Sequence, residues 1–439
     1  MRNSQMTRAS RAVRSTRRGR HILAARAVVA GIALTLVAAA CHDITTLEQS
    51  NPGQLGPGVF APENADLIVN SSKGDFQCAF NEYITATGLF VDELRNAISQ
   101  TANFDLDRRT MTPDHFSGQA DCTSQQIPGV YTTLSVARAS NDVALSHLEG
   151  WTDEQVSDRD HLIAVSAAYS GYSLVLMGEG MCSAALDLGP ELSPAQLFAD
   201  AKERFDTAVV AATRAGDDET LNLALLGRAR TELDLGNSAD AATDAALIPE
   251  GFEVDIDHDA TNTRRQNLVF IHIVQAQFSS ADTSIINRYE ADHDPRIAVT
   301  DLDALGSDGA TEIWLPAKDA SATSPQALAK YSEAQLIIAE NDVNTGALPA
   351  AKTIINNLRE AADLPDFNPA TLTATNVMDE IVEQRKRELY LEGHRLGDLR
   401  RLNLPLAPAT GAPYVSGGTY GDQSCFPLPN VERINNPNL

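Results

Sequence analysis

Aromatic residues are scarce in this 439-residue chain: they make up 5% of it, and only two are tryptophan. Ligands that stack on rings, such as sugars, therefore have few side chains to bind. The sequence also lacks an HExxH helix, a GxGxxG loop and a Walker loop, and its acidic alternation Asp255–Asp259 lacks the glycine and glutamate of an EF-hand. These absences predict a protein without a metal or cofactor, and they leave an enzymatic function unsupported.

A single long apolar run, Ala27–Ala40, follows a leader that holds eight arginines and no acidic residue. This order is typical of a secretory signal peptide, and the run is shorter than the roughly 20 residues that span a bilayer. We assign residues 1–40 to the signal peptide. The small residues before Cys41 resemble a bacterial lipobox, in which Cys41 is lipidated. The alternative is cleavage after Ala-x-Ala, which leaves a free thiol.

Basic residues are outnumbered by acidic ones, 34 to 59, and the net charge is −25. Loss of the leader lowers this charge to −33, because the eight arginines are its only charged residues. Such a field repels a phosphate backbone, so we exclude nucleic acid as a partner.

Cysteine is rare, but beyond Cys41 its number is even: Cys78, Cys122, Cys182 and Cys425. In an exported chain this indicates two disulfides, with three possible connectivities. No two of these cysteines lie within four residues of each other, which argues against a metal site. We favour Cys78–Cys122 and Cys182–Cys425, the second of which ties the C-terminal tail to the first half.

Alanine and leucine periodicity predicts a mostly α fold. Residues 41–75 are rich in Gly, Pro and Asn, and form either a tether or a loop over the body. Residues 76–250 form a first helical region, in which Ser193 caps a helix, and residues 326–439 form a C-terminal region.

Glycine turns at Gly236 and Gly346 separate short helices that carry small residues, such as Gly227 and Ala241, where helices would cross. This is the pattern of tetratricopeptide-like helix pairs. We expect three such pairs, with irregular spacing.

Residues 251–325 interrupt this array as a loop-rich insertion, a natural place for a ligand surface. The candidates for ligand contact are aromatic side chains in loops or at helix ends: Trp314, Trp151, Tyr289, Tyr414 and Tyr420. Each of them either stacks on a ligand or packs beneath a loop.

The most charged run of the exported chain is residues 379–402, with the sequence DEIVEQRKRELYLEGHRLGDLRRL. Glu388, Glu392 and Arg395 are spaced so that they share one helical face, and Gly393 ends or bends that helix. The run is a solvated helix, a buried polar ladder, or a pair of carboxylates for acid–base work.

Several blocks, in this order, resemble the SusD/RagB family of outer-membrane nutrient-binding lipoproteins. The blocks are Cys41 with Asn51-Pro52, Asp294-Pro295-Arg296, Tyr331-Ser332-Glu333-Ala334, the stretch Ile381–Arg400, and Phe426-Pro427-Leu428-Pro429. The C-terminal third matches best. The binding aromatics of the family form no transferable motif, so the resemblance assigns no ligand residue.

The resemblance implies a SusD-like α fold and a lipid-anchored outer-membrane protein that faces the cell surface. It implies a non-enzymatic protein that binds an oligosaccharide or a peptide and acts as a lid on a SusC-like TonB-dependent transporter. The alternative is an exported tetratricopeptide-like scaffold that assembles envelope proteins without binding nutrients.

The matching family block lies in the scaffold, which favours a buried polar ladder for the charged run. We expect Glu388, Glu392, Arg395 and Asp398 to pair across helices and to hold the last helix under the tail. Removal of one partner would strand a buried charge at a cost of about 3–5 kcal/mol.

Overall fold

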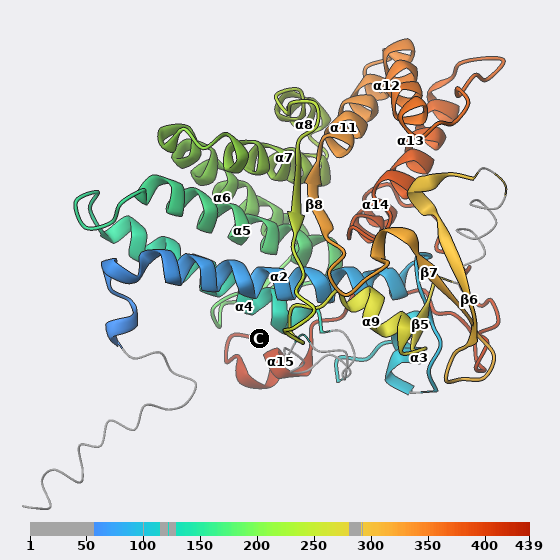
Figure 1. The fold of residues 1–439 in the computed structure, drawn as a ribbon, viewed down its shortest axis with the longest axis horizontal. Helices are drawn as coiled ribbons and strands as arrows, with labels where there is room; N and C mark the ends of the chain where they lie inside the picture. The colour runs from blue at the N-terminus through green and yellow to red at the C-terminus, as the bar shows by residue number, and fades with distance from the viewer. Residues whose placement is uncertain (1–56, 100, 115–121, 123–128, 281–290, 292) are drawn as a thin grey trace, which may run out of the picture. The chain divides into compact units, whose positions relative to one another are not determined.

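In the first half of the body, each main helix packs on the next one along the chain. The computed structural model describes residues 57–99, 101–114, 122, 129–280, 291 and 293–439. The main helices of this half are α2 (Ala65–Phe90), α4 (Tyr131–Gly150), α5 (Arg159–Gly180), α6 (Pro194–Ala215), α7 (Asp218–Asp234) and α8 (Ser238–Ala245). They form successive layers in that order (Figure 1).

Small residues allow these layers to pack closely. A Cβ atom on Gly227 of α7 would lie 2.4 Å from the Phe205 ring of α6, and one on Gly171 of α5 would lie 2.9 Å from it. Helix α5 is long and apolar enough to cross a membrane, but most of it is buried inside the body, as expected for a core helix. Only a residue without a side chain fits at these crossings.

Several local signals act as predicted. Ser193 accepts a hydrogen bond from the backbone N–H of Gln196 in a capping box that begins α6. Gly236 and Gly346 have φ values of +82° and +81° in the turns that follow α7 and α11 (Tyr331–Asn344). These conformations favour glycine.

The start of the body differs from the sequence prediction. Residues 41–75 were assigned to a tether or loop, but α2 begins at Ala65. Its first two turns bury Ile68, Val69 and Ser72, and α2 packs on α4. The helical period therefore starts earlier than the polar composition of this segment indicated.

The C-terminal half continues the array. Helix α11 packs on α8, on α12 (Leu348–Ala361) and on α13 (Ala374–Glu388). These helices enclose a core of their own, in which Leu336, Ile355 and Ile381 are fully buried. The short helices α14 (Arg395–Arg401) and α15 (Asn430–Asn435) follow. The fold is thus mostly α, with tetratricopeptide-like helix pairs, as predicted.

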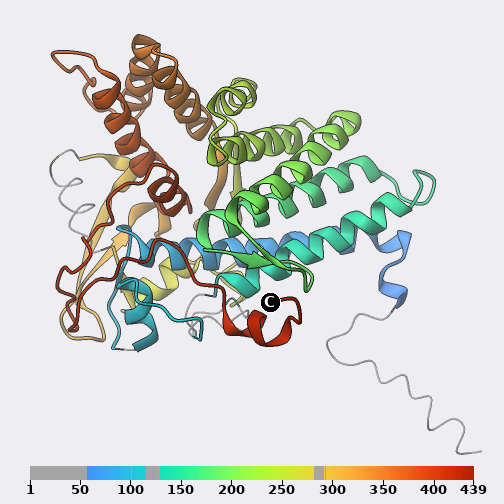
Figure 2. The ribbon, with the colours of Figure 1, turned by 180° about the vertical axis from the view of Figure 1, so that it is seen from behind.

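Short antiparallel strand pairs and minor helices complete the body. The pairs are β1 (Arg95–Asn96) with β5 (Phe278–Ser279), β2 (Ala184–Ala185) with β3 (Glu191–Leu192), β4 (Glu253–Ile256) with β8 (Gln326–Lys330), and β6 (Val299–Leu305) with β7 (Glu312–Pro316). The minor helices are α3 (Thr101–Asp107), α9 (Leu268–Val274), η1 (Pro57–Val59), η2 (Pro62–Asn64), η3 (Pro295–Ile297) and η4 (Ala317–Asp319). The β6–β7 hairpin and the α4–α5 connection lie at opposite ends of the body (Figure 2).

Two disulfides join distant segments. Cys78 bonds to Cys122, and Cys182 bonds to Cys425, with Cα–Cα distances of 5.6 and 5.1 Å. This is the pairing that the sequence analysis favoured. The second bond fastens the C-terminal tail beside the end of α5, where the backbone of Phe426 also pairs with Met181.

Candidate functional site

The charged run 379–402 is divided by a tight turn. Helix α13 ends at Glu388 and α14 begins at Arg395. Between them, Leu391 and Gly393 have φ values of +53° and +78°. The break at Gly393 agrees with the sequence analysis, but Glu388, Glu392 and Arg395 do not share a helical face as predicted, because the helix ends before the second of them.

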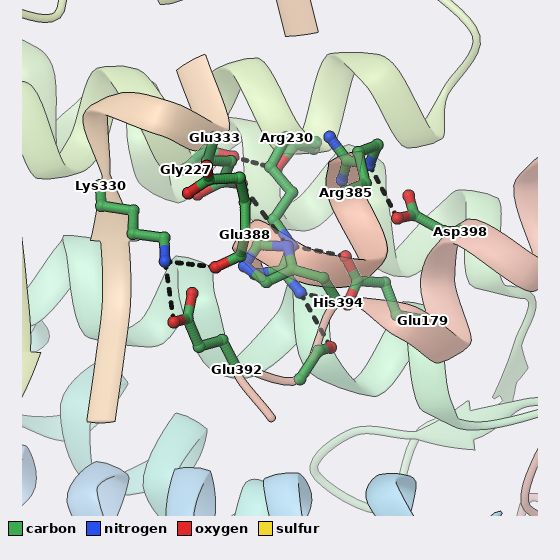
Figure 3. Close-up of polar contacts among 12 residues, drawn as sticks. Glu179, Gly227, Arg230, Lys330, Glu333, Arg385, Glu388, Glu392, His394 and Asp398 are labelled. Carbon is green, nitrogen blue, oxygen red and sulfur yellow. Dashed lines mark hydrogen bonds and ion pairs between the residues drawn. The ribbon is translucent and has the colours of Figure 1, made fainter. Parts of the chain in front are cut away.

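The centre of the polar network is a buried ion pair between α5 and α7 (Figure 3). Nε and Nη2 of Arg230 each donate to a carboxylate oxygen of Glu179 at 2.6 Å, and both side chains are only 3% exposed. Arg230 Nη2 also donates to the carbonyl of Gly393, at 3.2 Å. One guanidinium thus joins two helices to the turn that divides the charged run.

The turn brings His394 against the same guanidinium. Its Nε2 lies 3.3 Å from Nη1 of Arg230, which can only donate, so Nε2 accepts. Burial and the charges of Arg230 and Arg385 hold the pKa of His394 well below its ordinary value, so the ring is neutral. Its single proton therefore sits on Nδ1, 3.7 Å from Oε1 of Glu333.

Glu333 is the least satisfied acid in this network. It is 1% exposed, and its Oε1 makes no hydrogen bond with the described residues. Burial raises its pKa to about 7, although Arg230 and Arg385 act to lower it. Near neutral pH this carboxyl therefore exchanges a proton inside the scaffold.

Each of the four predicted ladder residues forms an ion pair: three pair with residues outside the charged run, and Asp398 pairs within it. The contacts are Glu388 with Arg296 at 2.7 Å, Glu392 with Lys330 at 2.8 Å and with Lys318, Arg395 with Asp92 at 2.9 Å, and Asp398 with Arg385 at 2.7 Å and with Arg401 at 2.8 Å. The four residues do not contact one another. Their pairs join the run to η3, η4, β8 and the segment that follows α2.

Neighbouring cations hold two carboxylates of this network, Asp398 and Asp92, in their ionised form. Arg385 and Arg401 outweigh the effect of burial and lower the pKa of Asp398 to about 2. Lys386 and Arg395 likewise lower the pKa of Asp92. Removal of one partner of such a buried pair is strongly destabilising, and a carboxylate held in this way is not free to exchange a proton with a substrate.

Two of the predicted ligand aromatics are buried. Tyr414 is 4% exposed, and its hydroxyl donates to Asp107 at 3.0 Å. Tyr420 is 2% exposed, and its ring lies under the guanidinium of Arg109, 5.0 Å from the ring centroid. Their side chains anchor the tail and present no ring face to a ligand in this structure. Tyr289 lies outside the described residues.

The two tryptophans are half-buried and lie on separate elements. Trp314 is in β7 of the hairpin, opposite Asp301 on β6. Trp151 follows the last residue of α4, at the α4–α5 connection. The structure therefore does not gather the predicted aromatics into one site.

A cleft of about 450 Å³ lies between the α4–α5 connection and the α6–α7 turn. Its polar walls include Asp153, Arg159, Asp160, His161 and Asp217. Sequence reasoning missed these residues, because the two turns that carry them lie about 60 positions apart and share no motif. Within the described residues, no group of three or more His, Cys, Asp or Glu side chains could hold a metal ion.

Comparison with known proteins identifies the fold. Residues 318–433 match the model of the SusD family. This region is SusD-like in sequence. The matched region contains β8, α11, α12, α13 and α14, and therefore most of the polar network described above.

Solved structures resemble the chain over most of its length and show that its fold is SusD-like. A SusD-like carbohydrate binding protein from Bacteroides vulgatus has a TM-score of 0.63 at 14% identity, over 86% of this chain and 97% of its own. A SusD superfamily protein from Bacteroides fragilis has a TM-score of 0.64 at 14% identity, over 86% and 99%. A SusD superfamily protein from B. vulgatus has a TM-score of 0.61 at 16% identity, over 78% of this chain and 88% of its own. No curated protein matches the chain by sequence.

Proposed function

We propose that this SusD-like protein is a carbohydrate-binding lipoprotein of the outer membrane that captures oligosaccharides without cleaving them. The observation that carries the proposal is the SusD family match across residues 318–433, together with similarity to a structure described as a carbohydrate binding protein. Glu388, Glu392 and Asp398 are each paired with a cation, which supports a binding role for the charged run over one in glycoside hydrolysis.

In this proposal Cys41 carries the lipid, and the bound glycan passes to a SusC-like TonB-dependent transporter. The acidic body suits a soluble domain held away from an anionic membrane surface. Binding shifts the pair from an open to a closed state to the extent that the ligand prefers the closed one. Trp151 and Trp314 are the candidate ring contacts, because Tyr414 and Tyr420 are buried.

The partner and the anchor are tested together by expressing the full chain in its native envelope. We expect the wild-type protein to incorporate radiolabelled palmitate and to co-purify with a large β-barrel from detergent-solubilised outer membranes. Cys41→Ser is the matched control, and it should lose the label. Recovery of the wild type as an unlabelled, soluble periplasmic monomer would contradict the proposal and favour the scaffold alternative.

A further inference from the structure

The turn between α13 and α14 joins two hydrophobic cores. Val377 and Ile381 of α13 lie in the separate core of the C-terminal helices, whereas Leu396 and Leu399 of α14 lie in the main core of the body. Residues 389–394 connect the two helices, and we call them the linking turn. How firmly this turn is held therefore determines how firmly the two cores are joined.

Two buried acids contact the linking turn from different parts of the chain. Oε1 of Glu93, in the segment that follows α2, accepts a hydrogen bond from the backbone N–H of Leu391 at 3.1 Å. Oε1 of Glu333, on α11, lies 3.7 Å from Nδ1 of His394 (Figure 3). Both acids are 1% exposed, so the body encloses their carboxyl groups.

Neither acid has the ion-pair partner that neighbouring carboxylates have. Asp92, which directly precedes the first of them, pairs with Arg395 at 2.9 Å and with Lys386. Within the described part of the chain, Glu93 and Glu333 form no ion pair with an arginine or a lysine, and the imidazole beside the second is neutral. A buried carboxylate without a paired charge is costly, so these two acids favour their protonated form.

Burial raises the pKa of Glu93 and of Glu333 to about 7, against an ordinary value of 4.5. The surrounding cations lower these pKa values and the surrounding carboxylates raise them, but neither effect outweighs burial. The titratable and charged groups that face Glu93 are Asp92, Lys318, Lys386 and Arg395. Those that face Glu333 are Tyr172, Glu179, Arg230, Arg385, Glu392 and His394. Near neutral pH both acids therefore change their charge.

We propose that Glu93 and Glu333 form a proton-operated latch on the linking turn. With both carboxyl groups protonated, the turn lies closed against the helical array. When they lose their protons, two carboxylates without ion-pair partners lie beside the turn, and it opens locally so that water reaches them. Mildly acidic surroundings therefore fasten the two cores together, and mildly alkaline surroundings loosen the connection between them.

The size of the effect follows from the difference between the closed and the open turn. In the open turn both acids meet water and regain the ordinary pKa of 4.5, so the closed turn is fully favoured below pH 4.5, and this advantage is lost as pH rises through about 7. Between pH 6 and pH 8, each acid thereby raises the opening equilibrium constant about tenfold. His394 acts in the opposite direction by about fourfold, because burial and neighbouring cations hold its pKa below the ordinary 6.5 in the closed turn. The net increase in the opening constant is about twentyfold.

Native-state hydrogen exchange at pH 6, 7 and 8 measures this opening at the amides of residues 390–394, after correction for the intrinsic effect of pH on exchange. We expect the protection factor of the Leu391 amide to fall about twentyfold from pH 6 to pH 8. Low concentrations of urea should leave its exchange unchanged, because a local opening exposes little surface, whereas amides in the middle of α5 should follow global unfolding. A protection factor that does not fall, or turn amides that exchange only through global unfolding, would overturn the latch.

Glutamine variants test whether these two acids are the proton-binding groups. Glu93→Gln and Glu333→Gln imitate the protonated acids, and each should remove about tenfold of the fall in protection. In the double variant, the protection of the turn should no longer fall between pH 6 and pH 8. Glu149→Gln, which changes an exposed acid on α4, is the matched control and should leave the wild-type response unchanged. Circular dichroism establishes that each variant is folded. A double variant that keeps the full wild-type response would overturn the assignment of the latch to Glu93 and Glu333.

Discussion

Arg230→Met tests the role of the polar network most sharply. The substitution keeps much of the side-chain volume but removes the two 2.6 Å bonds to Glu179 and the contacts to Gly393 and His394. Glu179, 3% exposed, then lacks its cation. Breaking a buried pair in this way costs about 3–5 kcal/mol, a large part of the 5–15 kcal/mol that stabilises a typical domain.

The assay is urea unfolding at pH 7, followed by far-UV circular dichroism with both disulfides intact. The double variant Arg230→Met/Glu179→Gln should recover more than half of the loss, because it also removes the stranded charge. Arg214→Met is the exposed control, since its pair with Asp160 lies near the surface and should contribute at most about 1 kcal/mol. A loss in Arg230→Met no larger than that of Arg214→Met would refute the scaffold interpretation.

Three further predictions follow from the same contacts. The pKa of Glu333, about 7, lies above its ordinary value of 4.5, so the contribution of this group to the unfolding free energy is lost as pH rises from 4.5 to about 7. Glu333→Gln should therefore flatten the pH dependence of the unfolding free energy and stabilise the protein at pH 8 by up to about 3 kcal/mol. An unchanged pH dependence in urea unfolding would contradict this prediction. Replacing Cys182 and Cys425 together by serine opens a link between residues 243 positions apart and should cost about 2–5 kcal/mol, measured as a lower urea midpoint; an unmoved midpoint would count against it. Arg395→Ala should destabilise the protein less than Arg230→Met in the same assay, because Lys386 still pairs with Asp92. A larger loss of stability in Arg395→Ala would show that Lys386 does not compensate.

The sequence predicted the features that depend on neighbouring residues. The cap at Ser193 and the turn glycines Gly236 and Gly346 act within one or two helical turns of chain. The cap and the turn glycines are local signals, whereas Gly227, which packs against Phe205 of α6, was predicted from the small-residue pattern of helix pairs. The start of α2 at Ala65 was missed, because polar residues near it outweighed a short apolar period.

The partners of the charged run could not be predicted, because they are far away in sequence. Arg395 pairs with Asp92 and Glu388 pairs with Arg296, and no periodicity links such positions. The same limit applies to the cleft, whose walls come from two separate helix connections. Tyr414 and Tyr420 looked accessible in a loop-rich tail, but long-range contacts fold that tail against the body and bury them.

The central claim is that this SusD-like protein binds carbohydrate without cleaving it. The most direct measurement passes residues 42–439 over immobilised α-glucan, β-glucan and xylan, and analyses the eluate for released sugars. The account predicts saturable retention on at least one of the three columns, with elution by the matching soluble oligosaccharide and no shortened products. Release of shorter oligosaccharides, or passage through all three columns without retention, would contradict it.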